Sequence, residues 1–376
     1  MPKAEGGPHA TRPPWEPLTR FAGAPLGSGA NFRDSCERQR ILTYHFRYNV
    51  TGTGTSLMPT IVQAVPIEDE LHDMLAEAGD VRVVDGRDRG AFLEAVKDAD
   101  GVLGNPLITI DQQVVDLAPN LKVVATTSVG FDAFDVPFLT SNGIALCNTP
   151  GVLSAAVADL TMAFLLMLSR HLMEFEAYNR SGGWGRREPY PGLANDPYGK
   201  TIGIVGFGRI GQEVARRAVF AGMKVLWYDI YDNPPADAPP AEKRSLDDLL
   251  AESDFVSVHT DLNQSSRHMI GAREIALMKP TAYLINTSRG PAVDQKALHD
   301  ALVANQIAGA GLDVLEDEPP DPDEPIVKLP NVISFPHIGT ATEETRYAMR
   351  ALATRNVVNV VSGNRPEAIV NPEVLG

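Results

Sequence analysis

The sequence predicts an α/β protein built from two doubly wound parallel sheets, and three observations lead to this prediction. From residue 58 onward, short apolar runs alternate with amphipathic stretches, which is the pattern of buried parallel strands joined by crossover helices. A long segment with few helix breakers, about 152–180, then predicts one continuous helix. A second alternation follows it, so the chain carries two strand–helix series that suggest two doubly wound domains.

The expected elements follow one another in a regular order. The strands of the first series are expected at 60–65, 81–84, 100–103, 121–126 and 144–146. Amphipathic stretches between them are expected to be helices near 67–78, 90–97 and 111–118. The strands of the second series are expected near 201–206, 223–229, 254–258, 282–286, 308–312 and 331–335. A final helix at about 341–362 and a short tail, 364–376, come after them.

The composition is that of a globular protein with a sizeable core, because 44% of the 376 residues are hydrophobic and 22% are charged. A net charge of −15 argues against nucleic acid or an anionic membrane surface as the main partner, since both attract a basic face. Two cysteines, Cys36 and Cys147, are too few for a disulfide framework or a thiolate zinc site, and we expect no metal. The longest apolar run, 160–168, is too short to span a bilayer, and we interpret it as a buried helix between the domains and a surface of a homodimer.

Residues 1–57 differ from the rest of the chain, with seven basic against four acidic side chains and no helical or strand period. This stretch is rich in Gly, Pro, Ser and Thr, so we expect it to be disordered. An arginine-rich, acid-poor segment is typical of an organelle transit peptide. A floppy tail, or a gene model that begins upstream of the true start at Met58, are the alternatives that we favour. We therefore expect a cytoplasmic protein; import of the protein into an organelle, directed by residues 1–57, is the alternative.

A glycine pattern between a strand and a helix predicts a dinucleotide site. Gly206, Gly208 and Gly211 form Gly-x-Gly-x-x-Gly. The first glycine permits a tight turn, the second lets the backbone approach a pyrophosphate, and the third lets the helix pack close to the strand. Arg209 and Ile210 begin that helix, whose N-terminal amides would face the phosphates.

A carboxylate at the end of the next expected strand predicts which coenzyme is used. Asp229 stands 18 residues after Gly211. A carboxylate there accepts hydrogen bonds from ribose hydroxyls and repels a 2′-phosphate. The sequence therefore predicts NAD(H) rather than NADP(H), with a solvated loop acid as the alternative interpretation of Asp229.

Arg289, Glu318 and His337 each follow a different strand of the second series. Because the carboxyl ends of parallel strands share one edge of the sheet, we expect these side chains to meet beside the nicotinamide. A guanidinium grips a carboxylate and polarises a carbonyl, a histidine donates a proton to the forming alkoxide, and a carboxylate orients the imidazole. This set suits hydride transfer to a 2-keto acid. Each residue alone has a simpler explanation: a surface ion pair, a solvated turn acid or a structural histidine.

Residues 58–372 resemble the D-isomer-specific 2-hydroxyacid dehydrogenase family. The matching stretches run in order along the chain: 127–132, the glycine pattern through Asp229, 258–260, 286–290, 311–319 and 336–340. We expect a substrate domain formed by 58–154 and 338–372, into which an NAD-binding Rossmann-like domain, 155–337, is inserted.

The resemblance also implies the roles of individual residues. It makes Arg289 the substrate-binding arginine, Glu318 the partner acid and His337 the general acid/base. The loop of Val129 and Gly130 would hold the substrate carboxylate through its backbone amides. The residues expected around the dinucleotide are Gly206, Gly208, Arg209, Ile210, Gly211, Asp229, Thr260, Thr287, Ser288, Arg289, Asp313, His337, Gly339 and Thr340.

Within the family, the stretches 148–153 and 181–184 resemble the glyoxylate/hydroxypyruvate reductase branch. Glu318 differs from the glutamine of the formate dehydrogenase branch, and the absence of an arginine at 105–107 disfavours a phosphorylated substrate. Asp261 stands where the family usually has proline. The resemblance implies NADH-dependent reduction of glyoxylate or hydroxypyruvate to the D-2-hydroxy acid. The alternatives are an NAD(H)-sensing corepressor or scaffold on the same fold, and a dehydrogenase of phosphite or another oxyanion.

Overall fold

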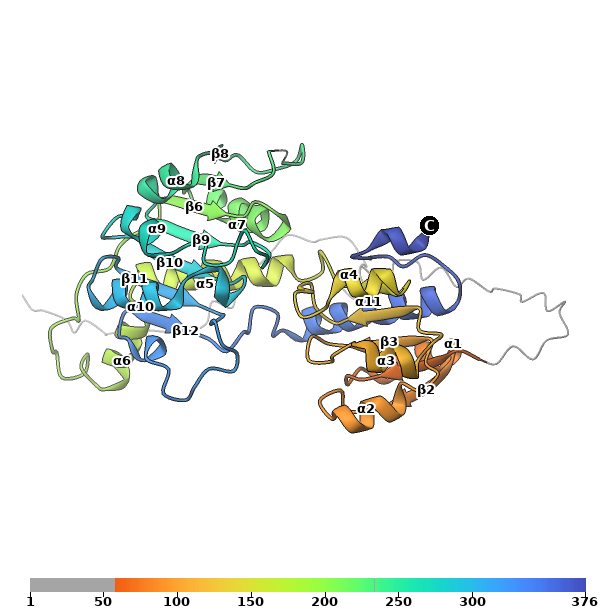
Figure 1. Cartoon of the computed structure of the whole chain (residues 1–376). Coiled ribbons are helices and arrows are strands. Elements are labelled where there is room, and N and C mark those ends of the chain that lie inside the picture. Colours follow the sequence, from red (N-terminus) through yellow and green to blue (C-terminus); the bar gives the residue numbers. More distant parts are fainter. Residues whose placement is uncertain (1–57, 233) are drawn as a thin grey trace, which may run out of the picture. The chain divides into compact units, whose positions relative to one another are not determined.

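The computed structural model describes residues 58–232 and 234–376. In this part of the chain the strands form two sheets in which every pair of neighbouring strands is parallel, as the alternation predicted (Figure 1). The expected disorder of residues 1–57, and the choice between a transit peptide, a tail and an upstream start, lie outside the described residues.

The first sheet has five strands in the order β2–β1–β3–β4–β5. The strands are β1 (Thr60–Gln63), β2 (Asp80–Val83), β3 (Gly101–Gly104), β4 (Val123–Thr126) and β5 (Ala145–Cys147). The helices between them are α1 (Asp69–Ala78), α2 (Arg89–Ala95), α3 (Gln112–Leu117) and α4 (Val136–Ser141). The strand order reverses between β1 and β3, and ligands of open α/β sheets bind at such a switch point.

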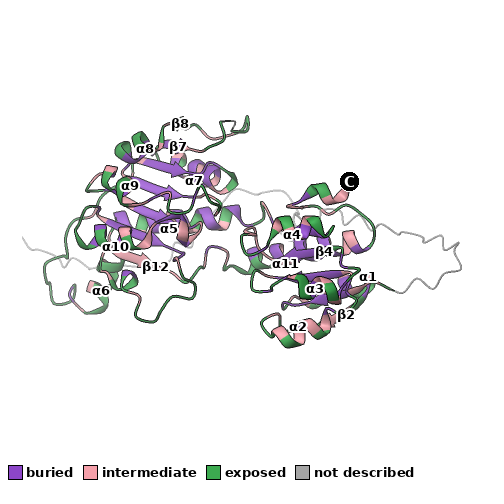
Figure 2. Cartoon of the chain, viewed as in Figure 1, coloured by how far each residue is buried: buried purple, intermediate pink, exposed green. Residues whose placement is uncertain are grey.

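Both faces of the first sheet are covered, which explains why its strands read as continuous apolar runs. Val62, Val102, Val124 and Leu146 are paired across four strands and pack on one face in a cluster with Phe92. The alternate residues of the same strands form a second cluster with α1 and the long helix α11 (Glu343–Val361). Figure 2 shows the inner strands of the sheet as buried and the outer faces of the helices as exposed, whereas the edge strand β2 is only partly buried.

The second sheet has seven strands in the order β12–β11–β10–β9–β6–β7–β8. The strands are β6 (Thr201–Val205), β7 (Lys224–Tyr228), β8 (Glu242–Lys243), β9 (Phe255–Val258), β10 (Tyr283–Asn286), β11 (Gly309–Leu312) and β12 (Val332–Ser334). The helices are α7 (Arg209–Phe220), α8 (Leu246–Glu252), α9 (Ala272–Leu277) and α10 (Gln295–Val303), with short 3₁₀ turns η1 (Gly290–Ala292) and η2 (Ile326–Lys328). The order reverses between β6 and β9, as it does in dinucleotide-binding sheets.

The expected single helix over 152–180 is wrong. Two helices occupy this segment, α5 (Ser154–Ser169) and α6 (Leu172–Arg180), and they are bent by 65°. His171 has a left-handed backbone with φ 49°, which ends the helical hydrogen-bond pattern. Because the break falls at a histidine and not at a glycine or proline, the sequence did not indicate it. No single helix in the described ranges is long and apolar enough to cross a membrane; among bent helix pairs of the same residues, only α5 and α6 together have that length and composition.

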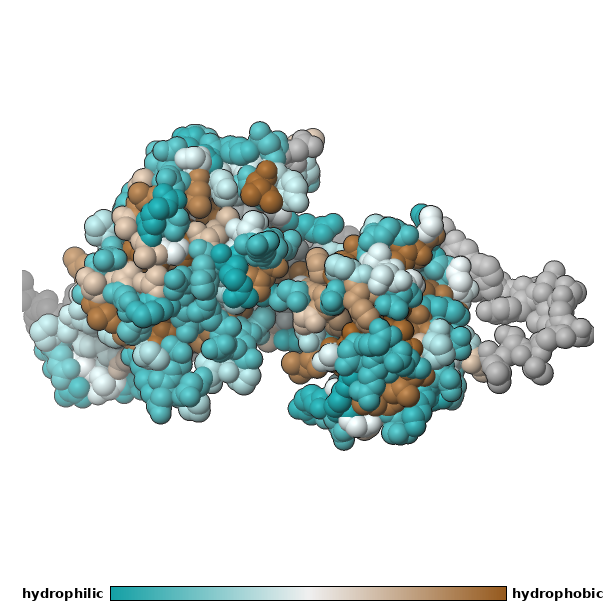
Figure 3. All heavy atoms as spheres, viewed as in Figure 1, coloured by the Kyte–Doolittle hydropathy of each residue, from teal (hydrophilic) through white to brown (hydrophobic). Residues whose placement is uncertain are grey.

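The short elements α4 and β8 were not predicted, and the structure shows where the expected tail lies. α4 and the two-residue strand β8 are too short for a hydrophobic period to be visible. The tail after α11 returns to β5, where the Val370 N–H donates to the Leu146 carbonyl at 2.8 Å, and it ends in the 3₁₀ turn η3 (Pro372–Leu375). The domain boundaries at 154/155 and 337/338 stay a prediction. Figure 3 shows hydrophilic residues over most of the visible surface, with hydrophobic residues in separate groups.

Candidate active site

The loop after β6 has the backbone that the glycine pattern predicted. Gly206 has φ 94°, and a Cβ there would lie 2.6 Å from the carbonyl oxygen of His259, at the end of β9. A Cβ at Gly211 would lie 2.2 Å from the Gly206 carbonyl oxygen, so α7 begins tightly against the loop. A Cβ at Gly208 would meet no atom within 4 Å, which leaves this backbone open to a ligand.

Asp229 follows β7 and ties its end to the glycine loop. Its Oδ2 accepts a 2.7 Å hydrogen bond from the Phe207 N–H, and its Oδ1 accepts one of 3.0 Å from the Tyr231 N–H. Each carboxylate oxygen has a second lone pair, and the side chain remains partly exposed. An open glycine, the N-terminus of a 12-residue helix and a partly exposed carboxylate fit a dinucleotide at the switch point.

A cavity of about 550 Å³ is lined by loops that follow strands of both sheets. The predicted residues in its lining are Val129, Gly130, Ile210, Thr260, Thr287, Ser288, Arg289, Asp313, Glu318, His337, Gly339 and Thr340. The other predicted residues, which lie in the glycine loop, at the start of α7 and after β7, are Gly206, Gly208, Arg209, Gly211 and Asp229. The loop adjoins the cavity, because a Cβ at Gly206 would lie 3.0 Å from the Thr260 nitrogen.

His337 and Glu318 form a hydrogen-bonded pair. The Nδ1 of His337 lies 2.7 Å from Oε2 of Glu318, and Oε1 of Glu318 accepts a 3.1 Å hydrogen bond from the Leu315 N–H. Burial alone would raise the pKa of Glu318, but the hydrogen bond and charge of His337, the Leu315 amide and the charge of Arg289 together hold it below its usual 4.5. Glu318 is therefore a carboxylate at neutral pH. The other ring nitrogen of His337, Nε2, has no hydrogen-bond partner among the described residues.

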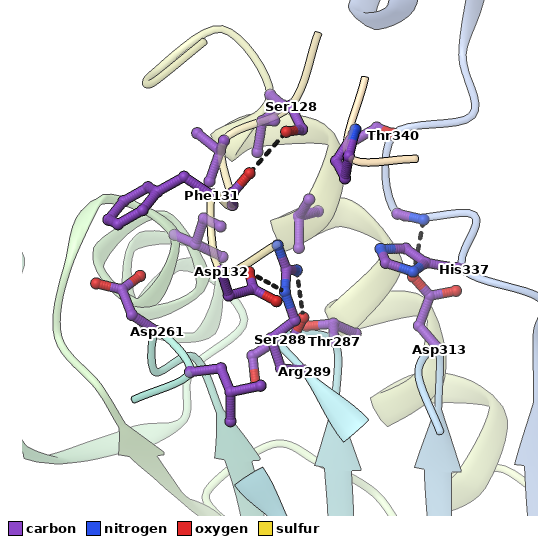
Figure 4. Close-up of a pocket in the computed structure, with 18 of the residues that line it drawn as sticks. Ser128, Phe131, Asp132, Asp261, Thr287, Ser288, Arg289, Asp313, His337 and Thr340 are labelled. Carbon is purple, nitrogen blue, oxygen red and sulfur yellow. Dashed lines mark hydrogen bonds and ion pairs between the residues drawn. The ribbon is translucent and has the colours of Figure 1, made fainter. Parts of the chain in front are cut away.

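Asp313 holds the loop that carries His337. The residue is 2% exposed, and the two oxygens of its carboxylate each accept a 2.8 Å hydrogen bond, one from the Ile338 N–H and one from the Gly339 N–H. Burial raises the pKa of Asp313, and the two backbone hydrogen bonds oppose that shift. The His337 N–H donates to the Asp313 carbonyl at 2.9 Å, and His337 takes a left-handed φ of 54°. Figure 4 shows His337 and Asp313 close together at the cavity.

The loop of Val129 and Gly130 lines the cavity, and its amides are free in the described part of the chain. The Val129 carbonyl accepts a 2.8 Å hydrogen bond from Nδ2 of Asn148, and the Gly130 carbonyl accepts one of 2.7 Å from Oγ of Ser128. The two N–H groups of this loop have no partner in 58–232 or 234–376. Backbone amides in this state are suited to bind a carboxylate.

Arg289 reaches from the loop after β10 to the loop after β4. Its Nε donates to Oδ1 of Asp132 at 3.0 Å, and its Nη1 donates to the Ser288 carbonyl at 2.9 Å. Its Nη2 lies against Gly130, where a Cβ would be only 1.4 Å away. Figure 4 shows Arg289 and Asp132 pointing toward one another. Asp132 was not among the predicted site residues; it is the last residue of the matching stretch 127–132, where only the loop backbone was considered.

Several further residues of the site were not predicted. Oγ1 of Thr161, on α5, lies 2.9 Å from Oγ1 of Thr287. His259 lines the cavity with its Nε2 2.8 Å from Oγ of Ser257, and burial lowers its pKa to about 3. Its Nδ1, like Oγ1 of Thr260, is buried without a partner in the described part of the chain. The lining also includes Asp261, Arg346 and Met349. His259 lies in the matching stretch 258–260 and Asp261 directly follows it, so the motifs marked this loop without giving either side chain a role. Thr161, Arg346 and Met349 belong to none of the matching stretches, and only their place in the fold connects them with the site.

Metal ligands do not gather in the described residues: no group of three His, Cys, Asp or Glu side chains is placed to hold an ion there.

Comparison with known proteins identifies the family. Residues 162–339 match the family described as D-isomer specific 2-hydroxyacid dehydrogenase, NAD binding domain. The chain is 44% identical over 309 residues to a glyoxylate reductase of Thermofilum pendens, which covers 80% of this chain and 91% of that protein.

Solved structures agree with this match. The TT0316 protein from Thermus thermophilus superposes with a TM-score of 0.76 and 38% identity, over 83% of this chain and 99% of that one. An NADPH-dependent glyoxylate/hydroxypyruvate reductase from Sinorhizobium meliloti, solved with NADP and malonate, has a TM-score of 0.74 and 30% identity, over 83% of this chain and 97% of that one. The family expected from the motifs is confirmed: the chain belongs to the D-isomer specific 2-hydroxyacid dehydrogenase family and is an NAD-dependent oxidoreductase.

Proposed function

We propose that this chain reduces a small 2-keto acid to the D-2-hydroxy acid with NADH, and that glyoxylate and hydroxypyruvate are the favoured substrates. The observation that carries the proposal is that Arg289 and the hydrogen-bonded Glu318–His337 pair line one cavity beside the glycine loop. The relatives named glyoxylate reductase and glyoxylate/hydroxypyruvate reductase support the choice of substrate.

The cofactor would lie along the carboxyl edge of the seven-stranded sheet, and when bound its dihydronicotinamide supplies the hydride. The open backbone at Gly208 and the first amides of α7, at Arg209 and Ile210, would bind the pyrophosphate. Asp229 would accept hydrogen bonds from ribose hydroxyls. The remaining proposed contacts come from residues of the cavity lining: Thr260, Thr287, Ser288, Asp313, Gly339 and Thr340.

The substrate carboxylate would be held from two sides. Val129 and Gly130, whose N–H groups are free among the described residues, line the cavity, and Nη2 of Arg289 lies against Gly130. A guanidinium in this place also polarises the keto oxygen as negative charge develops there. We assign the substrate domain to residues 58–154 together with 338–372, and the dinucleotide-binding domain to residues 155–337.

The proton for the new hydroxyl group would come from His337. Glu318 stays ionised because its pKa is lowered, and its Oε2 lies 2.7 Å from Nδ1. A proton on Nδ1 is held by this carboxylate, which leaves Nε2 to donate the proton to the substrate oxygen. Glu318 thereby orients the imidazole.

Steady-state NADH oxidation tests the proposal with glyoxylate, hydroxypyruvate, pyruvate and bulkier 2-keto acids side by side. We expect turnover of glyoxylate and hydroxypyruvate. We expect His337→Gln to lower kcat by about 10²–10⁴ while the Kd of NADH changes little. His299→Gln, on the surface beside Asp300, is the matched control. Failure of the wild-type chain to reduce any of these acids would contradict the proposal and favour a binding protein on the same fold.

The finer properties are also proposals. Large apolar side chains are exposed along α5, α6 and the loop after them, and they support a homodimer through this segment: Leu166, Leu172, Met173, Trp184, Tyr190 and Leu193. We propose the cytoplasm as the location, because we favour a tail or an upstream start over a transit peptide for residues 1–57. Fractionation of cells that express the whole chain would separate this location from an organelle.

A further inference from the structure

Asp132 is an acid in the cavity to which neither the motifs nor the proposed chemistry assigns a role. It follows β4 of the five-stranded sheet, and about a third of its side chain is exposed. Its one ion-pair partner in the described residues is Arg289, 157 positions later and at the end of a strand of the other sheet. The contact therefore joins the loop that would bind the substrate carboxylate to the arginine that would do the same.

The guanidinium of Arg289 is held at two of its three nitrogens. Nε donates to Oδ1 of Asp132 at 3.0 Å, and Nη1 donates to the Ser288 carbonyl at 2.9 Å. Because the guanidinium is planar and rigid, these two contacts fix the direction of the third nitrogen. Nη2 has no hydrogen-bond partner within the described part of the chain, and it lies directly against Gly130.

We propose that Asp132 is a positioning residue, which orients Arg289 so that Nη2 faces the substrate beside the free amides of Val129 and Gly130. This inference rests on the proposed function and goes beyond it. A flexible arginine side chain without the Asp132 contact would sample other rotamers, and ordering it would then oppose substrate binding and correct alignment.

The hydrogen bond and the charge of Asp132 act in opposite directions. The hydrogen bond aims the guanidinium, whereas the negative charge partly neutralises Arg289 and weakens its attraction for an anionic substrate. Asparagine keeps an oxygen acceptor and removes the charge, and alanine removes both. The two variants therefore separate positioning from electrostatics.

The experiment compares the wild-type chain with Asp132→Ala and Asp132→Asn. Asp85→Ala is the matched control, because Asp85 also pairs with an arginine, Arg87 at 2.8 Å, on an exposed surface. The measurements are kcat and KM for glyoxylate, the Kd of NADH, the Kd of oxamate with NADH present, and Tm. Oxamate is an unreactive analogue with the same carboxylate beside a carbonyl.

We expect Asp132→Ala to lower kcat/KM by about 10–100-fold and to weaken oxamate binding, with the Kd of NADH unchanged. Asp132→Asn should stay within about 3-fold of the wild type, with a KM that does not rise. A lower KM in Asp132→Ala would overturn the inference, since Asp132 would then compete with substrate for Arg289. Equal losses in both variants, or a lower Tm without a kinetic change, would overturn it as well.

The same measurements distinguish a failure of this inference from a failure of the proposed function. Absence of wild-type turnover would contradict the function, and the oxamate measurement would still report on Asp132. Normal wild-type turnover with unchanged Asp132→Ala kinetics would contradict the positioning role alone.

Discussion

The carboxylates of Glu318 and Asp313 at the cavity are oriented by hydrogen bonds from neighbouring backbone groups. Glu318 is anchored by the Leu315 N–H and offers its other oxygen to His337. Asp313 uses both oxygens on the loop of Ile338 and Gly339. Catalytic groups need such anchoring, because small misplacements from the productive geometry reduce rates strongly.

Gly130 is required at its position by the arginine that lies against it. Gly130→Ala would place a methyl group 1.4 Å from Nη2 of Arg289, so the guanidinium must move away from the loop. We expect kcat/KM for glyoxylate to fall by about 100-fold, with little change in the Kd of NADH. Gly90→Ala, whose new methyl group would meet only an Asp88 oxygen at 3.4 Å, serves as the control. Full activity of Gly130→Ala would mean that Arg289 does not act from this position.

His259 predicts a pH dependence of stability. Burial lowers its pKa from 6.5 to about 3, so between these values the unfolded chain binds a proton that the folded chain does not. Stability from this group therefore rises with pH through this window and is lost as pH falls from 6.5 toward 3.

Urea unfolding of the wild type and of His259→Asn, from about pH 4.5 to 7.5, checks this expectation. The unfolding free energy of the variant should depend less steeply on pH than that of the wild type. Equal slopes in the two proteins would show that His259 is protonated in the folded state as easily as in the unfolded one.

Hydrogen bonds to Asp229 connect β6, α7 and β7 at the carboxyl ends of the two strands. Asp229 joins them through the Phe207 N–H and, through the Tyr231 N–H, fixes the segment that follows β7. Its carboxylate thus has a structural role in the loop besides the proposed role at the ribose. Substitution here affects both the shape of the glycine loop and the charge that a 2′-phosphate would meet.

Asp229→Ser should shift the coenzyme preference toward NADPH. Loss of the carboxylate removes repulsion of a 2′-phosphate, and loss of its hydrogen bonds should raise the KM for NADH by about 10-fold. The ratio of kcat/KM for NADPH to that for NADH is the measurement. Asp232→Ser, at an exposed acid that pairs with Lys243, is the control. An unchanged ratio would remove Asp229 from the ribose site.

The proposed dimer would form through the exposed apolar side chains of α5, α6 and the loop after them. Trp184 is 67% exposed and Leu193 is 89% exposed, which is costly for large apolar groups unless another surface covers them. Burial of such groups between two copies would stabilise the dimer in proportion to the apolar area removed from water.

Sedimentation velocity should give twice the mass of one chain for the wild type. The double variant Trp184→Asp with Leu193→Asp should sediment as a monomer at micromolar concentration, because each charge would have to be buried in the interface. Val83→Asp changes an apolar residue that is 64% exposed on β2, and it should remain dimeric. A dimeric double variant would place the interface elsewhere, and a monomeric wild type would contradict the dimer.

Local patterns in the sequence were enough to predict every strand except β8, the glycine loop and the family. Strands buried on both faces must be apolar throughout, so runs such as those of β4 and β10 are visible without any tertiary information. The Gly206 turn and the close start of α7 at Gly211 are local requirements that only glycine satisfies. Arg289, Glu318 and His337 could be placed at one edge because parallel strands share their carboxyl ends.

Contacts between side chains that are distant in the sequence became visible in the folded chain alone. Asp132 and Arg289 are 157 residues apart, and Asn371 accepts the Leu146 N–H from 225 residues away, so no local pattern links them. The break at His171 is equally invisible, since nothing in its residue type requires a left-handed backbone. Sequence patterns report local backbone preference and burial, whereas the direction of a long polar side chain depends on partners that folding brings within hydrogen-bond distance.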